Sequence, residues 1–236
     1  MSTTVERLMR ERGDMQCLHE PFMYDYYINK QHRTMPFFEP QENHPVSYAD
    51  VRNMIISKAQ KAPVFFKDMS YYVASELASD PEFSQQLTHC FLIRNPKASI
   101  ASYYKLDNEL TLDEIGIEAQ WQHYSHLLTL GCSPVIIQAE SIRKDSQATV
   151  NTWWEKIGLE AADEAFQWSS EHPEDWSQVK TWHESSINSR SIHPWSDEEE
   201  RLEQHRFEAA VKEAPHLLSF YNHHITFYEM LKQRSC

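Results

Sequence analysis

Residues 88–104 constrain the fold most, because they contain an abrupt change from strand to helix. Residues 90–93 (Cys-Phe-Leu-Ile) form an apolar run that is too short for a helix and is typical of a buried strand. Asn95 and Pro96 follow at once, and these residue types favour the N-cap and the first turn of a helix. We therefore predict a strand that ends at about Ile93 and a helix that begins at Pro96.

The start of this predicted helix has the features of an anion-binding site. Ala98, Ser102 and Leu106 recur at helical spacing, so one face carries small side chains and a hydroxyl group. Backbone N–H groups and the helix dipole favour an anion there, and Arg94 can hold its oxygens through two donors. A capped strand-to-helix turn with a solvated arginine explains the same residues, so both interpretations stay open at this point.

Length and composition fit one α/β domain over residues 1–236, with a mostly helical part from about residue 160. The net charge of −13 argues against a nucleic-acid partner, since binding to phosphate backbones needs clustered basic residues. No apolar stretch has membrane-spanning length and no signal peptide is visible, so we expect a cytoplasmic protein with no membrane partner. The four cysteines include no Cys-x-x-Cys pair, so neither a metal site nor a disulfide framework is predicted.

Further apolar runs predict strands at 14–18, 63–67 and 134–138, in addition to the strand at 89–93. Each is separated from the next by a helical stretch, and this alternation is typical of a parallel sheet with helices on both faces. The sequence therefore predicts an α/β fold with three layers. The main helices are expected at 2–12, with Ser2 or Thr3 as the cap, at 21–31, and at 47–61, with Ser47 as the cap. A helix to about residue 130 is expected to start with a capping box of Thr111 and Glu114, Ser196 is expected to cap a later helix, and a final helix at 215–233 is expected to bury Leu218.

The segment around Arg94 resembles the 3′-phosphate motif of the sulfotransferase family, bacterial type. The resemblance rests on residues 94–97 (Arg-Asn-Pro-Lys) and on residues 102–104 (Ser-Tyr-Tyr), with the serine eight residues after the arginine. The order of elements is similar from the start of the chain to about residue 160, and residues 139–159 resemble the family's late strand and the helix that follows it. Members use 3′-phosphoadenosine 5′-phosphosulfate as sulfuryl donor and release adenosine 3′,5′-bisphosphate. The resemblance implies a P-loop NTPase-like fold, with Arg94 and Ser102 on the 3′-phosphate.

The resemblance also implies donor contacts elsewhere. In the family, a strand and a Pro-Arg/Lys-Ser loop precede the first helix and hold the 5′-phosphosulfate; Ser2, Thr3 and Thr4 resemble the tail of that loop. Since the sequence given starts within it, we expect weak sulfuryl transfer with bisphosphate binding partly kept, and a homodimer as one way to cover the exposed strand edge. In the Ser-rich segment 182–194, Arg190 is a candidate for a second phosphate contact.

Candidate catalytic residues follow two of the predicted strands. His19 and Glu20 lie at the end of the first strand, where two titratable groups are candidates for a general base. A simple turn is the alternative, because a residue before proline is held extended. Lys67 ends the next strand, and the resemblance implies that it balances charge on the sulfuryl group; a solvated strand end is the alternative. Met69 stands where animal-type members carry the catalytic histidine.

The leading functional hypothesis is sulfuryl transfer to a hydroxyl or amine of a small-molecule acceptor, without a metal. One alternative is a non-catalytic, nucleotide-binding relative. Another is a different P-loop transferase such as a small-molecule kinase, which is disfavoured because the four glycines form no Gly-rich Walker segment. Residues 32–46 are interrupted by three prolines and are interpreted either as a substrate lid or as an ordinary surface loop.

Overall fold

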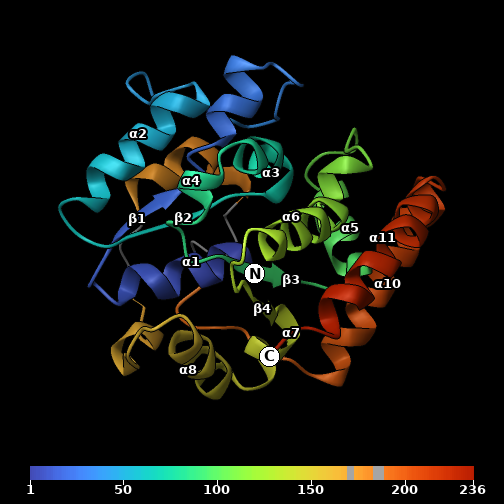
Figure 1. The fold of residues 1–236 in the computed structure, drawn as a ribbon. Helices are drawn as coiled ribbons and strands as arrows, with labels where there is room; N and C mark the ends of the chain where they lie inside the picture. The colour runs from blue at the N-terminus through green and yellow to red at the C-terminus, as the bar shows by residue number, and fades with distance from the viewer. Residues whose placement is uncertain (169–172, 183–188) are drawn as a thin grey trace. The chain divides into compact units, whose positions relative to one another are not determined.

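The computed structural model describes residues 1–168, 173–182 and 189–236 (Figure 1). It divides into two compact units. The first contains Met1–Val73 and Ala162–Ile192, and the second contains Ala74–Ala161 and His193–Cys236. Each unit has its own two-stranded parallel sheet. The prediction of one domain over the whole chain stays a prediction, since two compact units can belong to one domain.

The first unit is built on the parallel strands β1 (Gln16–His19) and β2 (Val64–Lys67), paired so that His19 lies opposite Lys67. Helix α3 (Ser70–Ser79) follows β2 and belongs to this unit only up to Val73. Side chains of α1 supply part of the core, because Leu8 and Met9 are almost fully buried. The other helical elements of this unit are α1 (Ser2–Glu11), the π-helical turn η1 (Asp25–Asn29), α2 (Tyr48–Ala59), η3 (Asp163–Phe166) and η4 (Glu174–Val179).

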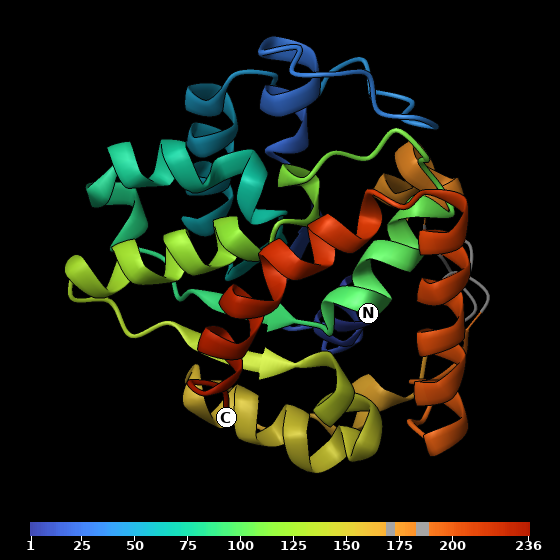
Figure 2. The same cartoon turned by 90° about the vertical axis from the view of Figure 1, so that its right-hand side faces the viewer.

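The second unit is built on the parallel strands β3 (Cys90–Ile93) and β4 (Val135–Gln138). Its helical elements are α4 (Pro81–Ser84), α5 (Pro96–Tyr104), η2 (Asp113–Ile115), α6 (Ile117–Thr129), α7 (Ala139–Lys144), α8 (Ser146–Lys156), α10 (Asp197–Glu213) and α11 (Leu217–Lys232). Figure 2 shows α10 (orange) beside α5 (green), and α11 also packs against α5 and α6. These helices and strands share one apolar core, which includes Phe91, Ile93, Ile100, Leu127, Ile136, Phe207, Leu217 and Leu231.

The predicted strand-to-helix turn is confirmed. Strand β3 ends at Ile93, and Asn95 caps α5 by accepting a hydrogen bond from the backbone N–H of Lys97 at 3.0 Å. Pro96 is the first helical residue. The caps at Ser47 and Ser196 are also confirmed, since each hydroxyl oxygen accepts a backbone N–H of the following helix at 3.2 Å. Local sequence signals therefore fix these helix starts.

The α/β class is confirmed, but the single parallel sheet is not found in the described residues. Strand β1 pairs with β2, and β3 pairs with β4, as two separate sheets. Alternating strands and helices indicate parallel pairing, yet they do not specify which strands are neighbours. The three-layer P-loop arrangement thus stays a prediction. None of the described helices has both the length and the apolar character that crossing a membrane requires.

Three helix predictions are corrected by the structure. The helix predicted at 2–12 has Met1 at its N-cap, so neither Ser2 nor Thr3 is the cap. The helix predicted at 21–31 is a short π-helical turn, η1. In the final helix, Leu218 was expected in the core but is 47% exposed, whereas Leu217 is fully buried. The apolar stripe of α11 starts one residue earlier than the sequence pattern indicated.

The segments 111–130 and 139–159 are each divided into two helical elements. The contact expected between Thr111 and Glu114 forms, with the Thr111 backbone N–H 2.8 Å from Oε2, but Gly116 at φ +77° separates it from α6. The late strand and following helix expected within 139–159 are instead the two helices α7 and α8, and Oδ1 of Asp145 between them accepts the Ala148 N–H at 3.1 Å. A left-handed glycine and a capping aspartate each end one helical segment before the next begins.

Candidate active site

The carboxyl ends of β1 and β2 bring the three predicted catalytic residues together in the first unit. His19 lies opposite Lys67, and the Glu20 backbone N–H donates to the Lys67 carbonyl oxygen at 2.8 Å. The ammonium group of Lys67 forms an ion pair with Oε1 of Glu20. The side chains of His19, Glu20 and Lys67 are 0%, 9% and 11% exposed. Their meeting follows from parallel strands, whose carboxyl ends lie at one edge of the sheet.

Glu6 of α1 holds the imidazole of His19. Its Oε2 lies 2.6 Å from Nδ1 of His19, and both side chains are fully buried. Oε1 of Glu6 accepts hydrogen bonds from the indole N–H of Trp176 at 2.7 Å and from the guanidinium of Arg10 at 2.8 Å. These contacts fix the orientation of the imidazole ring. The other ring nitrogen, Nε2, lies 4.0 Å from Oε1 of Glu20.

The charges of this buried cluster stabilise one another. Burial alone would raise the pKa of Glu6, but the facing His19 and Lys67 outweigh it and hold that pKa far below its ordinary value. Burial alone would lower the pKa of Lys67, yet the carboxylates of Glu20 and Glu6 keep it above its ordinary value. Glu6 therefore stays ionised and Lys67 stays positively charged at neutral pH.

Asp68 adds a carboxyl group that is costly to ionise. Burial and the nearby charge of Glu20 raise the pKa of Asp68 well above its ordinary value. Its Oδ1 accepts the Phe22 backbone N–H at 3.1 Å, whereas its buried Oδ2 has no hydrogen-bond partner among residues 1–168, 173–182 and 189–236. A carboxyl group with a raised pKa beside charged residues is a feature of functional sites and also of structural networks.

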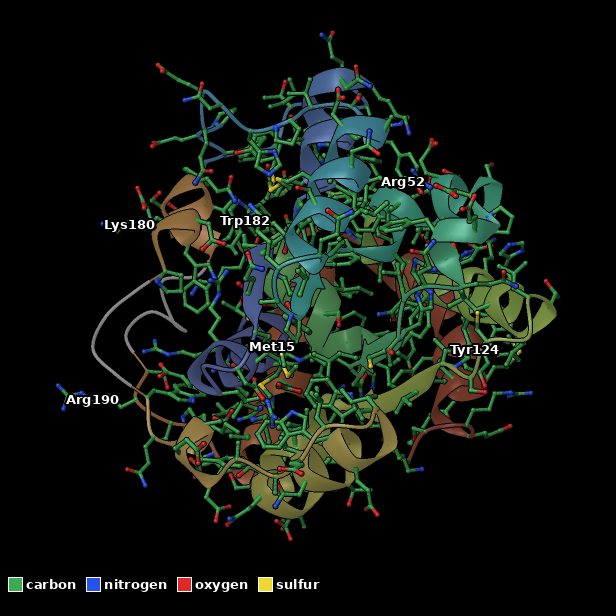
Figure 3. The ribbon with its side chains drawn as sticks, turned by 60° about the vertical axis from the view of Figure 1, so that its left-hand side comes forward. Met15, Arg52, Tyr124, Lys180, Trp182 and Arg190 are labelled. Carbon is green, nitrogen blue, oxygen red and sulfur yellow. The ribbon has the colours of Figure 1, made fainter. Side chains whose placement is uncertain are left out.

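Of the remaining predicted residues in the first unit, Ser2, Thr3 and Thr4 form the first turn of α1. Thr3 and Thr4 are 6% and 9% exposed, and the Val5 N–H donates to the Met1 carbonyl oxygen at 3.0 Å. Arg190 is exposed, and Figure 3 shows its side chain pointing outward. The neighbouring residues 183–188 of the predicted Ser-rich segment lie outside the described residues.

In the second unit, Arg94 lies at the end of β3 and already binds an anionic group. Its Nη2 is 2.5 Å from Oε1 of Glu203 in α10. Lys97 in the first turn of α5 donates to Oε1 of Gln204 at 2.7 Å. Ser102 is exposed on α5. Helix α10 thus contacts the cationic side chains of both Arg94 and Lys97.

A cavity of about 430 Å³ lies at the opposite end of β3 and β4, away from Arg94. Its walls include His89, which precedes β3, and Pro134, which precedes β4. None of the predicted site residues lines it. Among the described residues, no group of three or more His, Cys, Asp or Glu side chains is arranged to hold a metal ion.

A family model described as "Sulfotransferase domain" matches residues 1–205. The chain belongs to the sulfotransferase-domain family. Over 188 residues it is 24% identical to "Branched-chain-amino-acid aminotransferase-like protein 2" of Arabidopsis thaliana, a match that covers 78% of this chain and 33% of that protein. This sulfotransferase-domain chain thus spans about a third of the length of that relative. No solved structure matches it.

Within this sulfotransferase domain the predicted residues fall into two groups, each in its own unit. His19, Glu20 and Lys67 meet in the first unit. Arg94 and Ser102 belong to the second, eight residues apart across the β3–α5 turn.

The sequence did not indicate two carboxylates that contact these groups. Glu6 lies within α1, where a charged residue between apolar positions is usually solvated. Glu203 offered a signal: with Phe207 and Ala210 it forms the buried stripe of α10 at helical spacing. A carboxylate on such a stripe needs a cationic partner, because an unpaired buried charge is strongly unfavourable.

Proposed function

We propose that this chain transfers a sulfuryl group from 3′-phosphoadenosine 5′-phosphosulfate to a hydroxyl or amine of a small-molecule acceptor. Family membership supports the type of chemistry. The choice of donor rests on the turn at Arg94. There a strand ends, a capped helix begins, and the Arg94 guanidinium is paired with the Glu203 carboxylate. A guanidinium that binds a carboxylate offers the same N–H donors to a phosphate.

In this proposal, Arg94 and the Ser102 hydroxyl bind the 3′-phosphate of the donor. Arg94 supplies charge and paired donors, and Ser102 supplies a single hydrogen bond. The first turn of α1, at Ser2 to Thr4, supplies backbone N–H groups to the phosphosulfate end. Arg190 is exposed and stays a weaker candidate for a phosphate contact.

Glu20 is the base in this proposal, because its side chain is 9% exposed whereas that of His19 is fully buried. Glu20 accepts the proton of the attacking hydroxyl or amine as the acceptor atom bonds to sulfur. The donor supplies the sulfuryl group, and its bond from sulfur to the bridging oxygen breaks. Lys67 balances the negative charge that develops on the transferred group. His19, fixed by Glu6, is a positioning residue for Glu20.

The test is calorimetric titration with adenosine 3′,5′-bisphosphate. We expect Arg94→Ala to weaken binding about tenfold or more, since losing charge-assisted hydrogen bonds typically costs about 1.5–3 kcal/mol. Lys105→Ala is the matched control, because it removes one positive charge from an exposed position at the other end of α5. Equal affinity of Arg94→Ala and the parent would reject the phosphate site.

A non-catalytic nucleotide-binding protein is the second candidate function. The ion pair between Lys67 and Glu20 favours it, because both proposed catalytic groups are already neutralised by each other. Bisphosphate binding without transfer of labelled sulfate to any member of a panel of phenols, alcohols and amines would support this second function over the first.

A further inference from the structure

Glu203 contacts two guanidinium groups within the second unit. Its Oε1 lies 2.5 Å from Nη2 of Arg94 and 3.5 Å from Nη1 of Arg143 in α7. Glu203 is 7% exposed, whereas the side chain of Arg94 is 25% exposed. One buried carboxylate on α10 therefore joins an accessible guanidinium to a less accessible one.

Arg143 is held in place independently of Arg94. Its Nη2 donates to Oε2 of Glu199 at 2.9 Å, and its Nε donates to the His193 carbonyl oxygen at 3.0 Å. Its guanidinium carbon lies 4.9 Å from the centre of the Trp195 ring, within cation–π range. Because the Arg143 guanidinium is fixed beside it, the Glu203 carboxylate keeps a positively charged partner when Arg94 moves away.

We propose that Glu203 competes with the 3′-phosphate for Arg94 and thereby sets the affinity of the chain for nucleotides that carry this phosphate. The proposal rests on the proposed function, in which Arg94 binds the 3′-phosphate. Carboxylate and phosphate oxygens use the same guanidinium donors, and two anions at one position repel each other. Binding therefore requires Glu203 to release Arg94 while it stays beside Arg143.

This competition acts on only one part of the nucleotide. A nucleotide without a 3′-phosphate has no need to displace Glu203, so its affinity does not include the cost of breaking the ion pair. The donor and the bisphosphate product both carry the 3′-phosphate, so both include that cost and are held less tightly. Glu203 thus lowers the affinity for both, while the interactions with the rest of the nucleotide are unchanged.

A purely structural role for Glu203 makes a different prediction. If the carboxylate only ties α10 to the β3–α5 turn, removing its charge lowers the stability of the fold and does not tighten nucleotide binding. Glu203→Gln separates the two roles, because the amide has the same shape and keeps an oxygen acceptor for both arginines but lacks the charge.

The experiment measures the dissociation constants of adenosine 3′,5′-bisphosphate and adenosine 5′-monophosphate for the parent, Glu203→Gln and Glu200→Gln. Glu200 is exposed on the same helix, so its variant matches the change in net charge. We expect Glu203→Gln to bind the bisphosphate about three to ten times more tightly, in line with one weakened charge-assisted contact. The monophosphate affinity and both affinities of Glu200→Gln should stay within about twofold of the parent.

Several outcomes overturn the inference. Unchanged or weaker bisphosphate binding by Glu203→Gln, no detectable binding by either parent or variant, or equal tightening for both nucleotides would each reject it. Thermal unfolding of each variant shows whether the protein is folded. Failure of the proposed function is distinguishable, because Arg94→Ala would then bind the bisphosphate as tightly as the parent.

Discussion

At the scale of single residues, Glu20 combines an unusual backbone with a buried charge. Its φ of +41° lies in the left-handed region, which costs a residue with a side chain about 1–3 kcal/mol. Its backbone donates to the Lys67 carbonyl oxygen, and its carboxylate is held by Lys67 and by the Tyr72 hydroxyl at 3.4 Å. Such a conformation persists only where surrounding contacts determine it, and it points to a functional role.

We expect Glu20→Gln to lower the rate of sulfuryl transfer by about 100-fold or more while bisphosphate affinity stays nearly unchanged, because a general base acts only in the transition state. Transfer of labelled sulfate measures the rate, and calorimetry measures the affinity. His19→Asn is the comparison: as a positioning residue, His19 should have a smaller effect. A larger effect for His19→Asn, with Glu20→Gln fully active, would assign the base to histidine.

Asp68 provides a pH-dependent test of stability. Its pKa is raised in the folded protein, so ionising it in the fold costs free energy, and this cost grows as pH rises above the ordinary value of 3.8. We expect Asp68→Asn to raise the free energy of unfolding at pH 7 by about 1–3 kcal/mol, since the amide keeps the acceptor for Phe22 without the charge.

Urea unfolding at several pH values measures this effect. The advantage of Asp68→Asn should shrink as pH falls and should be lost below about pH 3.8, where the carboxyl group becomes protonated in the unfolded chain as well as in the folded chain. A variant that is less stable than the parent at pH 7 would show that the Asp68 charge is compensated in the fold.

The sequence predicted the site residues that lie at the carboxyl ends of parallel strands. His19, Glu20 and Lys67 follow parallel strands, so their meeting needs only the direction of the strands. The partners Glu6 and Glu203 depend on how α1 and α10 pack; helical spacing indicates that Glu203 is buried, but it does not identify the arginine that Glu203 contacts. Side chains that hold a site in place are therefore harder to find from sequence than those at strand ends.

At the scale of helices and strands, prediction succeeded where one residue type determines the geometry. Asn95 and Pro96 start α5, and Gly131 follows α6 at φ +77°. The helix boundary at Asp145 was not predicted, although an aspartate just before a helix is a capping signal.

Asp145→Ala tests whether this cap stabilises α8. The change removes the acceptor of the Ala148 N–H, so we expect the free energy of unfolding to fall by about 1 kcal/mol. Urea denaturation provides the measurement. Glu155→Ala, at an exposed position in the same helix, is the control and should change stability by less than about 0.5 kcal/mol. Equal effects of both changes would mean that the cap contributes little.

At the scale of the whole chain, composition and alternation predicted the α/β class but not the strand neighbours. The four apolar runs are similar in length and character, and each became a strand of four residues. The side chains of a short apolar run do not identify the strand that pairs with it, because paired strands are joined by hydrogen bonds between backbone groups. The division into two two-stranded sheets thus depends on packing that the sequence pattern does not show.

An approaching bisphosphate meets a chain of net charge −13 in which Arg94 is already paired with Glu203. A paired cation projects little field into solvent, so the long-range force on the nucleotide is repulsive. At physiological ionic strength, salt largely screens this repulsion at distances beyond about 8 Å. We therefore expect the association rate constant, measured by stopped flow, to rise from about 0.01 M to about 0.15 M salt. A steep fall of the rate constant with salt would indicate attraction by exposed basic residues. A rise means that binding depends on contacts formed after the nucleotide and the protein collide.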